Sequence, residues 1–197
     1  QAGTNAEAQN TRKSIENSQA GLVLEQKLSA EDSIRLLGYS GKRTVQQFLS
    51  IGMRGVIDLN REFGGLDARW TRQTSIADRP FTFTAGANYD EMQEVRKAFD
   101  NNAGNIGALV RDEDNTVFNF DQFAQAEWAL AERWILSGGL RHTSVKFKSE
   151  DHFITGTNGD DSGSIEFSDT TPVAGVVFKV TPTLNLYGNV GKGFETA

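Results

Sequence analysis

The sequence VFNFDQFAQAEWALAERWILSGGLRHTSVKF, residues 117–147, decides the fold. In its first half most even-numbered positions are apolar, ending at Trp128, whereas Gln125 and Glu127 are polar. Because successive side chains of a strand point to opposite faces, this pattern predicts a strand with one apolar and one polar face. A tight turn at residues 131–133 and a second alternating run from Trp134 complete a predicted β-hairpin.

Both strands of this hairpin are longer than strands of soluble proteins usually are. Such length is typical of a tilted strand that crosses a lipid bilayer. The hairpin therefore predicts a transmembrane β-sheet, and the rest of the chain is expected to repeat the same unit.

The composition of the 197-residue chain excludes several classes of protein. A net charge of −6 argues against a nucleic-acid partner. The absence of cysteine excludes disulfides, thiolate metal sites and cysteine nucleophiles. No catalytic constellation is present, so we expect no enzyme activity. The two histidines, His142 and His152, are predicted on a strand and in a loop, so neither a metal nor a cofactor is expected.

The remaining segments read as strands that alternate with turns and loops. The predicted strands are residues 20–28, 33–42, 63–73, 81–95, 117–130, 134–147, 166–180 and 184–194. The predicted long loops are residues 43–62 (with at most a short strand at 54–59), 97–116 and 150–165, and residues 1–18 are also predicted as a loop. Tight turns join the other strands.

Loop length carries further information, because short and long connections alternate along the chain. Outer-membrane barrels have short periplasmic turns and longer extracellular loops, whereas long structureless loops are uncommon in compact domains. We therefore predict an all-β, transmembrane, antiparallel up-and-down β-barrel. Residues 1–197 are interpreted as a fragment that forms an incomplete arc of about eight strands.

The three tryptophans, Trp70, Trp128 and Trp134, all fall near the predicted short-turn edge. Amphipathic rings favour the membrane–water interface, so these three side chains are predicted interface aromatics. The alternative is that they are ordinary core tryptophans.

Several charged or polar side chains alternate with the apolar ones along the strands, so they lie on the opposite face of the sheet. A charge on the lipid face near the midplane costs roughly 2–4 kcal/mol for Arg or Lys, so these side chains must point into the lumen if a barrel forms. The predicted lumen-facing residues are Asp67, Arg69, Gln125, Glu127 and Arg141.

Three motifs, at residues 120–128, 136–142 and in the hairpin of residues 171–196, resemble those of TonB-dependent outer-membrane receptors. Residues 120–128 (FDQFAQAEW) resemble the family's F-x-Q-x-E strand, and residues 136–142 (LSGGLRH) resemble its L-x-x-G-x-R-Y strand, with His142 in place of Tyr. Residues 171–179 (TPVAGVVFK) and 186–196 (LYGNVGKGFET) resemble the following hairpin. The resemblance covers residues 117–197. Residues 20–96 match the family only in the general style of their strands.

The resemblance implies a barrel of about 22 strands around a plug domain. The plug and the remaining strands would lie outside this chain. It implies a protein of the bacterial outer membrane, in contact with its lipid, that actively transports a scarce ligand, most often a ferric siderophore. Energy would come from the TonB–ExbB–ExbD complex through the plug. Haem, cobalamin or another small cofactor as ligand, a passive porin or adhesin-type barrel, and a soluble β-rich binding domain are the alternatives.

The family captures ligands with extracellular loops and the top of the plug. The predicted loops contain Arg43, Arg54, Arg61, Arg111 and Phe153, residue types that can bind an anionic or aromatic ligand. By resemblance, these are the candidate ligand-binding residues.

Overall fold

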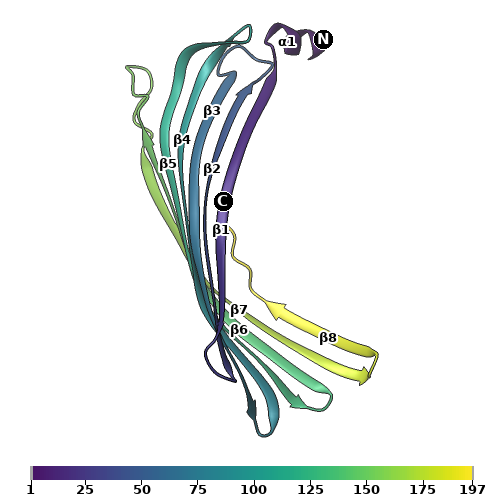
Figure 1. The fold of residues 1–197 in the computed structure, drawn as a ribbon. Helices are drawn as coiled ribbons and strands as arrows, with labels where there is room; N and C mark the ends of the chain where they lie inside the picture. The colour runs from purple at the N-terminus through teal and green to yellow at the C-terminus, as the bar shows by residue number, and fades with distance from the viewer. Residues whose placement is uncertain (1, 197) are drawn as a thin grey trace.

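The described residues contain eight strands, which form one antiparallel sheet with the order β1 to β8 (Figure 1). The computed structural model describes residues 2–196, and side chains from residue 5 onward. Its elements are α1 (Ala2–Ala8), β1 (Arg12–Lys27), β2 (Asp32–Phe48), β3 (Val56–Ile76), β4 (Arg79–Asn102), β5 (Asn105–Ala131), β6 (Trp134–Asp151), β7 (Gly163–Thr181) and β8 (Leu184–Gly191). The predicted all-β, up-and-down fold is thus confirmed.

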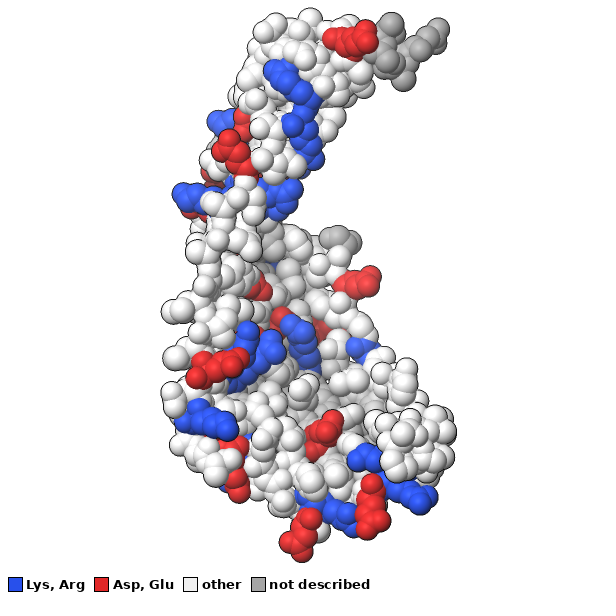
Figure 2. Space-filling view, turned by 45° about the vertical axis from the view of Figure 1, so that its right-hand side comes forward, with Lys and Arg blue, Asp and Glu red and all other residues white. Residues whose placement is uncertain are grey.

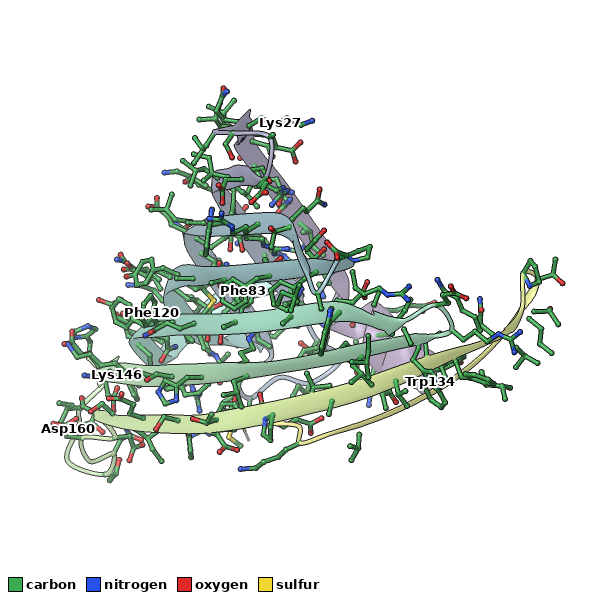
Figure 3. The ribbon with its side chains drawn as sticks, turned by 90° about the horizontal axis from the view of Figure 1, so that it is seen from below. Lys27, Phe83, Phe120, Trp134, Lys146 and Asp160 are labelled. Atoms are coloured by element: carbon green, nitrogen blue, oxygen red, sulfur yellow. The ribbon has the colours of Figure 1, made fainter. Side chains whose placement is uncertain are left out.

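The sheet is open and strongly curved. Within the described residues β1 pairs only with β2 and β8 only with β7, so the two outermost strands each have one unpaired edge. Figure 1 shows the long strands bending so that β7 and β8 curl round to face β1, which gives the sheet one concave and one convex face. Figure 3 shows side chains standing on both faces.

The sheet has one edge of uniformly short turns. The connections there are residues 28–31, 77–78, 132–133 and 182–183. Ala77 and Asp78 have φ values of 51° and 59°. Two successive positive φ angles are typical of a type I′ turn, whose twist matches that of the two strands it joins.

The opposite edge differs from the prediction in two of its three connections. Its loops are residues 49–55, 103–104 and 152–162, so the predicted long loops 43–62 and 97–116 are mostly strand. The predicted N-terminal loop 1–18 is also wrong, because it contains α1 and the start of β1. The backbone ladders continue into these segments, but strict alternation disappears there because polar and apolar side chains share one face, as Arg43, Ile57 and Leu59 do.

None of the helices in the described part of the chain has the length and apolar content needed to cross a membrane.

A small buried core lies at this second edge. Phe48 and Val56 are the largest fully buried side chains, and the guanidinium of Arg12 lies 3.5 Å from the centroid of the Phe48 ring. The buried Asn101 side chain donates from Nδ2 to the carbonyls of Leu49 and Gln9, each at 2.9 Å. These contacts hold the segment after α1 against the ends of β2 and β4.

The register places an apolar band on the convex face. Directly opposite residues share a face in an antiparallel pair, and one such row is Phe81, Trp128 and Leu136. The row above it contains Ala85, Ala124 and Leu140. A face of this kind, near the short-turn edge, suits contact with lipid.

Gly86 allows strands β3, β4 and β5 to pack closely, because an added Cβ would lie 2.6 Å from the Ala68 carbonyl oxygen and 2.7 Å from Phe123 Cζ. We expect Gly86→Val to lower the free energy of unfolding by about 1–3 kcal/mol through overpacking. Urea unfolding of the folded barrel in lipid or detergent measures this change. Gly188→Val is the control, because no described heavy atom lies within 4 Å of its added Cβ. Equal stability of the two variants would contradict the close packing at Gly86.

Candidate functional site

The concave face carries rows of polar side chains that cross four strands. Asp67, Asn88, Asp121 and Thr143 lie directly opposite one another on β3, β4, β5 and β6. Figure 2 shows this hollowed face, with charged side chains gathered in it. The polar parity that the sequence predicted on separate strands therefore converges on one continuous surface.

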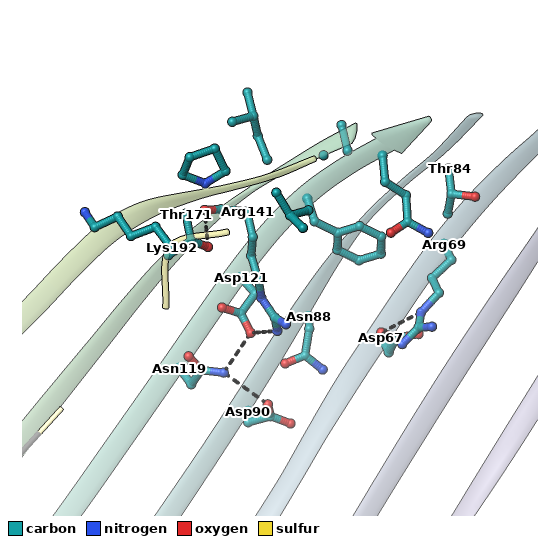
Figure 4. Close-up of a pocket in the computed structure, with 17 residues that line it drawn as sticks. Asp67, Arg69, Thr84, Asn88, Asp90, Asn119, Asp121, Arg141, Thr171 and Lys192 are labelled. Carbon is teal, nitrogen blue, oxygen red and sulfur yellow. Dashed lines mark hydrogen bonds and ion pairs between the residues drawn. The ribbon is translucent and has the colours of Figure 1, made fainter. Parts of the chain in front are cut away.

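Asp121 is the centre of one network on this surface (Figure 4). Only 3% of this residue is exposed. Its Oδ2 accepts hydrogen bonds from Arg141 Nη2 at 2.5 Å and Asn119 Nδ2 at 3.2 Å, and its Oδ1 accepts one from Thr143 Oγ1 at 2.5 Å. A buried carboxylate requires such partners, because an unpaired buried charge is strongly unfavourable.

Asp67 on β3 is the centre of a second network, two strands away from Asp121 on β5. It is 6% exposed and binds two guanidinium groups, Arg69 Nε at 2.9 Å and Arg35 Nη1 at 3.4 Å. Arg35 also pairs with Glu25 at 3.2 Å. Arg35 and Arg69 are directly opposite residues of β2 and β3, so the two carboxylates neutralise a close pair of cations.

These networks line a hollow of about 570 Å³ that extends from Asp67 and Arg69 on β3 to Arg141 on β6 and Lys192 beyond β8. The guanidinium of Arg69 lies 5.8 Å from the Phe123 ring centroid. Gln125 lines this hollow and an adjoining one of about 300 Å³, in which Glu127 also lies. The five residues predicted to face the lumen are thus brought to the same face.

A separate recess of about 380 Å³ lies farther along the concave face, toward the edge with the longer loops. Its charged lining consists of Lys13, Arg43, Arg61, Glu94 and Arg96. Glu94 accepts hydrogen bonds from Arg61 Nε at 2.9 Å and Nη2 at 2.5 Å.

The strand location of Arg43 and Arg61 corrects the sequence prediction, which put both in a loop. They are directly opposite residues of β2 and β3. The missed residues Lys13, Glu94 and Arg96 come from segments predicted as loop or as the end of a strand. Parity was the available signal for the two β4 residues, because Glu94 and Arg96 continue the even-numbered inward positions of that strand.

The other predicted ligand-binding residues lie apart from this recess. Arg54 is in the 49–55 turn at a φ of 54°, and its N–H donates to Asp100 Oδ1 at 2.9 Å. Arg111 is on β5, not in a loop, and pairs with Glu113 at 3.2 Å. Phe153 is in the 152–162 loop, where its N–H donates to Asp151 Oδ1 at 2.8 Å.

The three tryptophans lie on the convex face near the short-turn edge. Trp70 Nε1 donates to Asp32 Oδ1 at 3.1 Å, and Trp128 Nε1 donates to the Ile76 carbonyl at 3.4 Å. The ring of Trp134 packs against that of Phe178, with centroids 4.5 Å apart. Each ring therefore has an apolar or hydrogen-bonded contact compatible with a position at a membrane interface.

One exposed group on the convex face has atoms of the type that bind metals. Asp114, Glu150 and His152 have ligand atoms within 4.8 Å of one another. His152 Nε2 lies 3.1 Å from Asp114 Oδ2, and the Lys148 ammonium donates a hydrogen bond to Glu150. Because all three are exposed and already paired with protein groups, they form a charged surface network.

A curved antiparallel sheet with an apolar band on its convex face and a polar, hydrogen-bonded concave face is the wall of a transmembrane β-barrel. The chain belongs to the family described as TonB dependent receptor-like, beta-barrel, whose model matches residues 2–197.

Solved structures with the same fold include the siderophore receptor PiuA from Acinetobacter baumannii, with 14% identity and a TM-score of 0.76, covering 92% of this chain and 32% of that one. The ferric citrate transporter FecA in its unliganded form has 15% identity and a TM-score of 0.77, covering 92% and 28%. The ferric-catecholate import receptor Fiu from E. coli K12, in an open form, has 10% identity and a TM-score of 0.76, covering 92% and 36%. The chain thus spans about a third of the length of these proteins.

The ion pair between the buried Asp121 and the half-exposed Arg141 is expected to stabilise the barrel wall. In a double-mutant cycle with Asp121→Asn and Arg141→Gln, we expect a coupling free energy of at least about 1 kcal/mol, because each single change leaves the other group without its partner. Urea unfolding of the four proteins gives the value. The cycle for the exposed Lys42–Glu62 pair is the control and should show no resolvable coupling. Additive effects at Asp121 and Arg141 would refute a stabilising role for this pair.

Proposed function

We propose that this chain is part of the barrel wall of a bacterial outer-membrane receptor that takes up a ferric siderophore with energy supplied through TonB, ExbB and ExbD. The observation that carries the proposal is the contrast between the apolar band on the convex face and the charged concave face behind it, in a chain of the TonB-dependent receptor family. The convex face would contact membrane lipid, and the concave face would line the lumen.

The concave networks support a wall that encloses a plug domain. Asp67, Arg69, Gln125, Glu127 and Arg141 would face the plug and lumen water. The Asp67–Arg69 and Asp121–Arg141 pairs would keep these charges solvated by protein groups whether or not the plug moves. Trp70, Trp128 and Trp134 would mark the periplasmic interface, because they lie near the edge with the short turns.

Ligand capture would take place at the opposite, extracellular edge. Arg54 and Phe153 are on connections of that edge, Arg61 is in the recess below it, and Arg111 is on the neighbouring part of β5. The support for a siderophore is that PiuA and Fiu are a siderophore receptor and a ferric-catecholate receptor. Haem and cobalamin are alternative cargoes, and a passive porin or adhesin-type barrel is the alternative class.

Uptake of ⁵⁵Fe-labelled chelates by iron-limited cells tests this function. Cells that express the full-length receptor carrying this chain should accumulate label from at least one ferric siderophore. Accumulation should fall to the level of cells without the receptor when TonB is deleted, because transport of this kind needs energy from the inner membrane.

Two results would contradict the proposal in different ways. Undiminished uptake without TonB would show a passive channel. No uptake of any ferric siderophore, combined with TonB-dependent uptake of haem or labelled cobalamin in the same cells, would assign the receptor to another cargo.

A further inference from the structure

Two arginines face each other across neighbouring strands in the recess near the extracellular edge. Arg43 on β2 and Arg61 on β3 are directly opposite, which brings their Cβ atoms to about 4.5–5.5 Å in an antiparallel pair. Like charges in such a pair destabilise a sheet unless an anion lies between or beside them. Glu94, directly opposite Arg61 on β4, binds Arg61 alone.

The recess therefore has an excess of positive charge. Its lining contains the cations Lys13, Arg43, Arg61 and Arg96 and the single carboxylate Glu94. Among residues 5–196, no acidic group lies within ion-pairing distance of Lys13, Arg43 or Arg96.

The next strand does not remove this excess. Glu113 on β5 is directly opposite Arg96, but it pairs with Arg111 at 3.2 Å. Arg111 and Glu113 together add no net charge. Figure 2 shows Lys and Arg side chains along the upper arm of the concave side.

The lower part of the same wall shows that an excess of positive charge is not a general property of the concave face. There Arg35 and Arg69 also face each other across β2 and β3. Both bind Asp67, and Arg35 also binds Glu25, so two carboxylates match two cations. The recess has the same cross-strand arrangement without the matching anions.

The rest of the recess suits an organic anion. Val45, Ile57 and Leu59 form its apolar lining between the cationic groups. Guanidinium groups bind carboxylates through paired N–H donors, and an apolar surface between them can contact a carbon skeleton. A volume of about 380 Å³ is within the range of small-molecule sites.

We propose that this recess, called here the cationic recess and formed by Lys13, Arg43, Arg61, Glu94 and Arg96, binds the carboxylate groups of a negatively charged ferric chelate. The proposal rests on the proposed uptake of ferric siderophores and adds the charge class of the cargo. The barrel wall selects anionic, carboxylate-bearing chelates, and neutral chelates gain nothing from the recess.

Binding of two ⁵⁵Fe-labelled probes to the purified full-length receptor in detergent tests the proposal. The probes are ferric citrate, which is an anionic polycarboxylate chelate, and a neutral ferric trihydroxamate. The wild type should bind ferric citrate more tightly, and this preference should weaken as salt rises because charge interactions are screened.

The decisive variant is Arg43→Gln combined with Arg96→Gln, which removes two unpaired cations and keeps the Arg61–Glu94 pair. We expect its Kd for ferric citrate to rise about tenfold or more, with a change below about twofold for the neutral chelate. Arg43→Lys keeps the charge and should lose less affinity. Lys42→Gln is the matched control, because Lys42 precedes Arg43 but pairs with Glu62 on the convex face.

Each opposing result has a distinct meaning. If the wild type binds the neutral chelate as tightly as ferric citrate, or if the double variant keeps wild-type affinity for ferric citrate, the cationic recess is not a carboxylate subsite and the proposed uptake of ferric siderophores still stands. If the wild type binds neither probe and no other ferric chelate, the proposed function fails together with this inference.

Discussion

Backbone hydrogen bonding is the constraint on which the rest of this structure depends. In the hydrocarbon core of a membrane no water can satisfy an N–H or C=O group, so a strand must pair with its neighbours along its whole membrane-crossing length. Every residue of β3 pairs with β4 without a register shift. Because the ladders satisfy the backbone groups, each side chain need only suit the face on which its odd or even position in the strand places it.

Because the backbone is already satisfied by the ladders, a sheet with so small an apolar core can also contain buried charged side chains. On the convex face, side chains such as Trp128 and Leu136 suit lipid, whereas the concave face keeps polar groups at the same height. A charge held there away from bulk water must be paired, and Asp121 has three side-chain donors while Asp67 has two guanidinium groups.

The cationic recess departs from this pattern of matched charge. Its facing arginines cost stability in the isolated wall, and the long ladders between β2, β3 and β4 are what hold them in place. A binding site commonly carries such a local cost, because groups arranged for a ligand are not optimally arranged for each other. Its position on paired strands makes it more rigid than a site built from loops, which suits discrimination by charge.

The sequence by itself determined the fold class, the short-turn edge and the polar parity of Asp67, Arg69, Gln125, Glu127 and Arg141. These features depend on local rules, namely a side-chain period of two and the residue types that lipid excludes. Only the tertiary structure decided that residues 43–48, 56–62, 97–102 and 105–116 are strand, because strict alternation disappears where polar and apolar side chains share a face while the ladder continues. It alone brought Arg43 opposite Arg61 and Asp121 beside Arg141, because register between strands joins residues far apart in the chain.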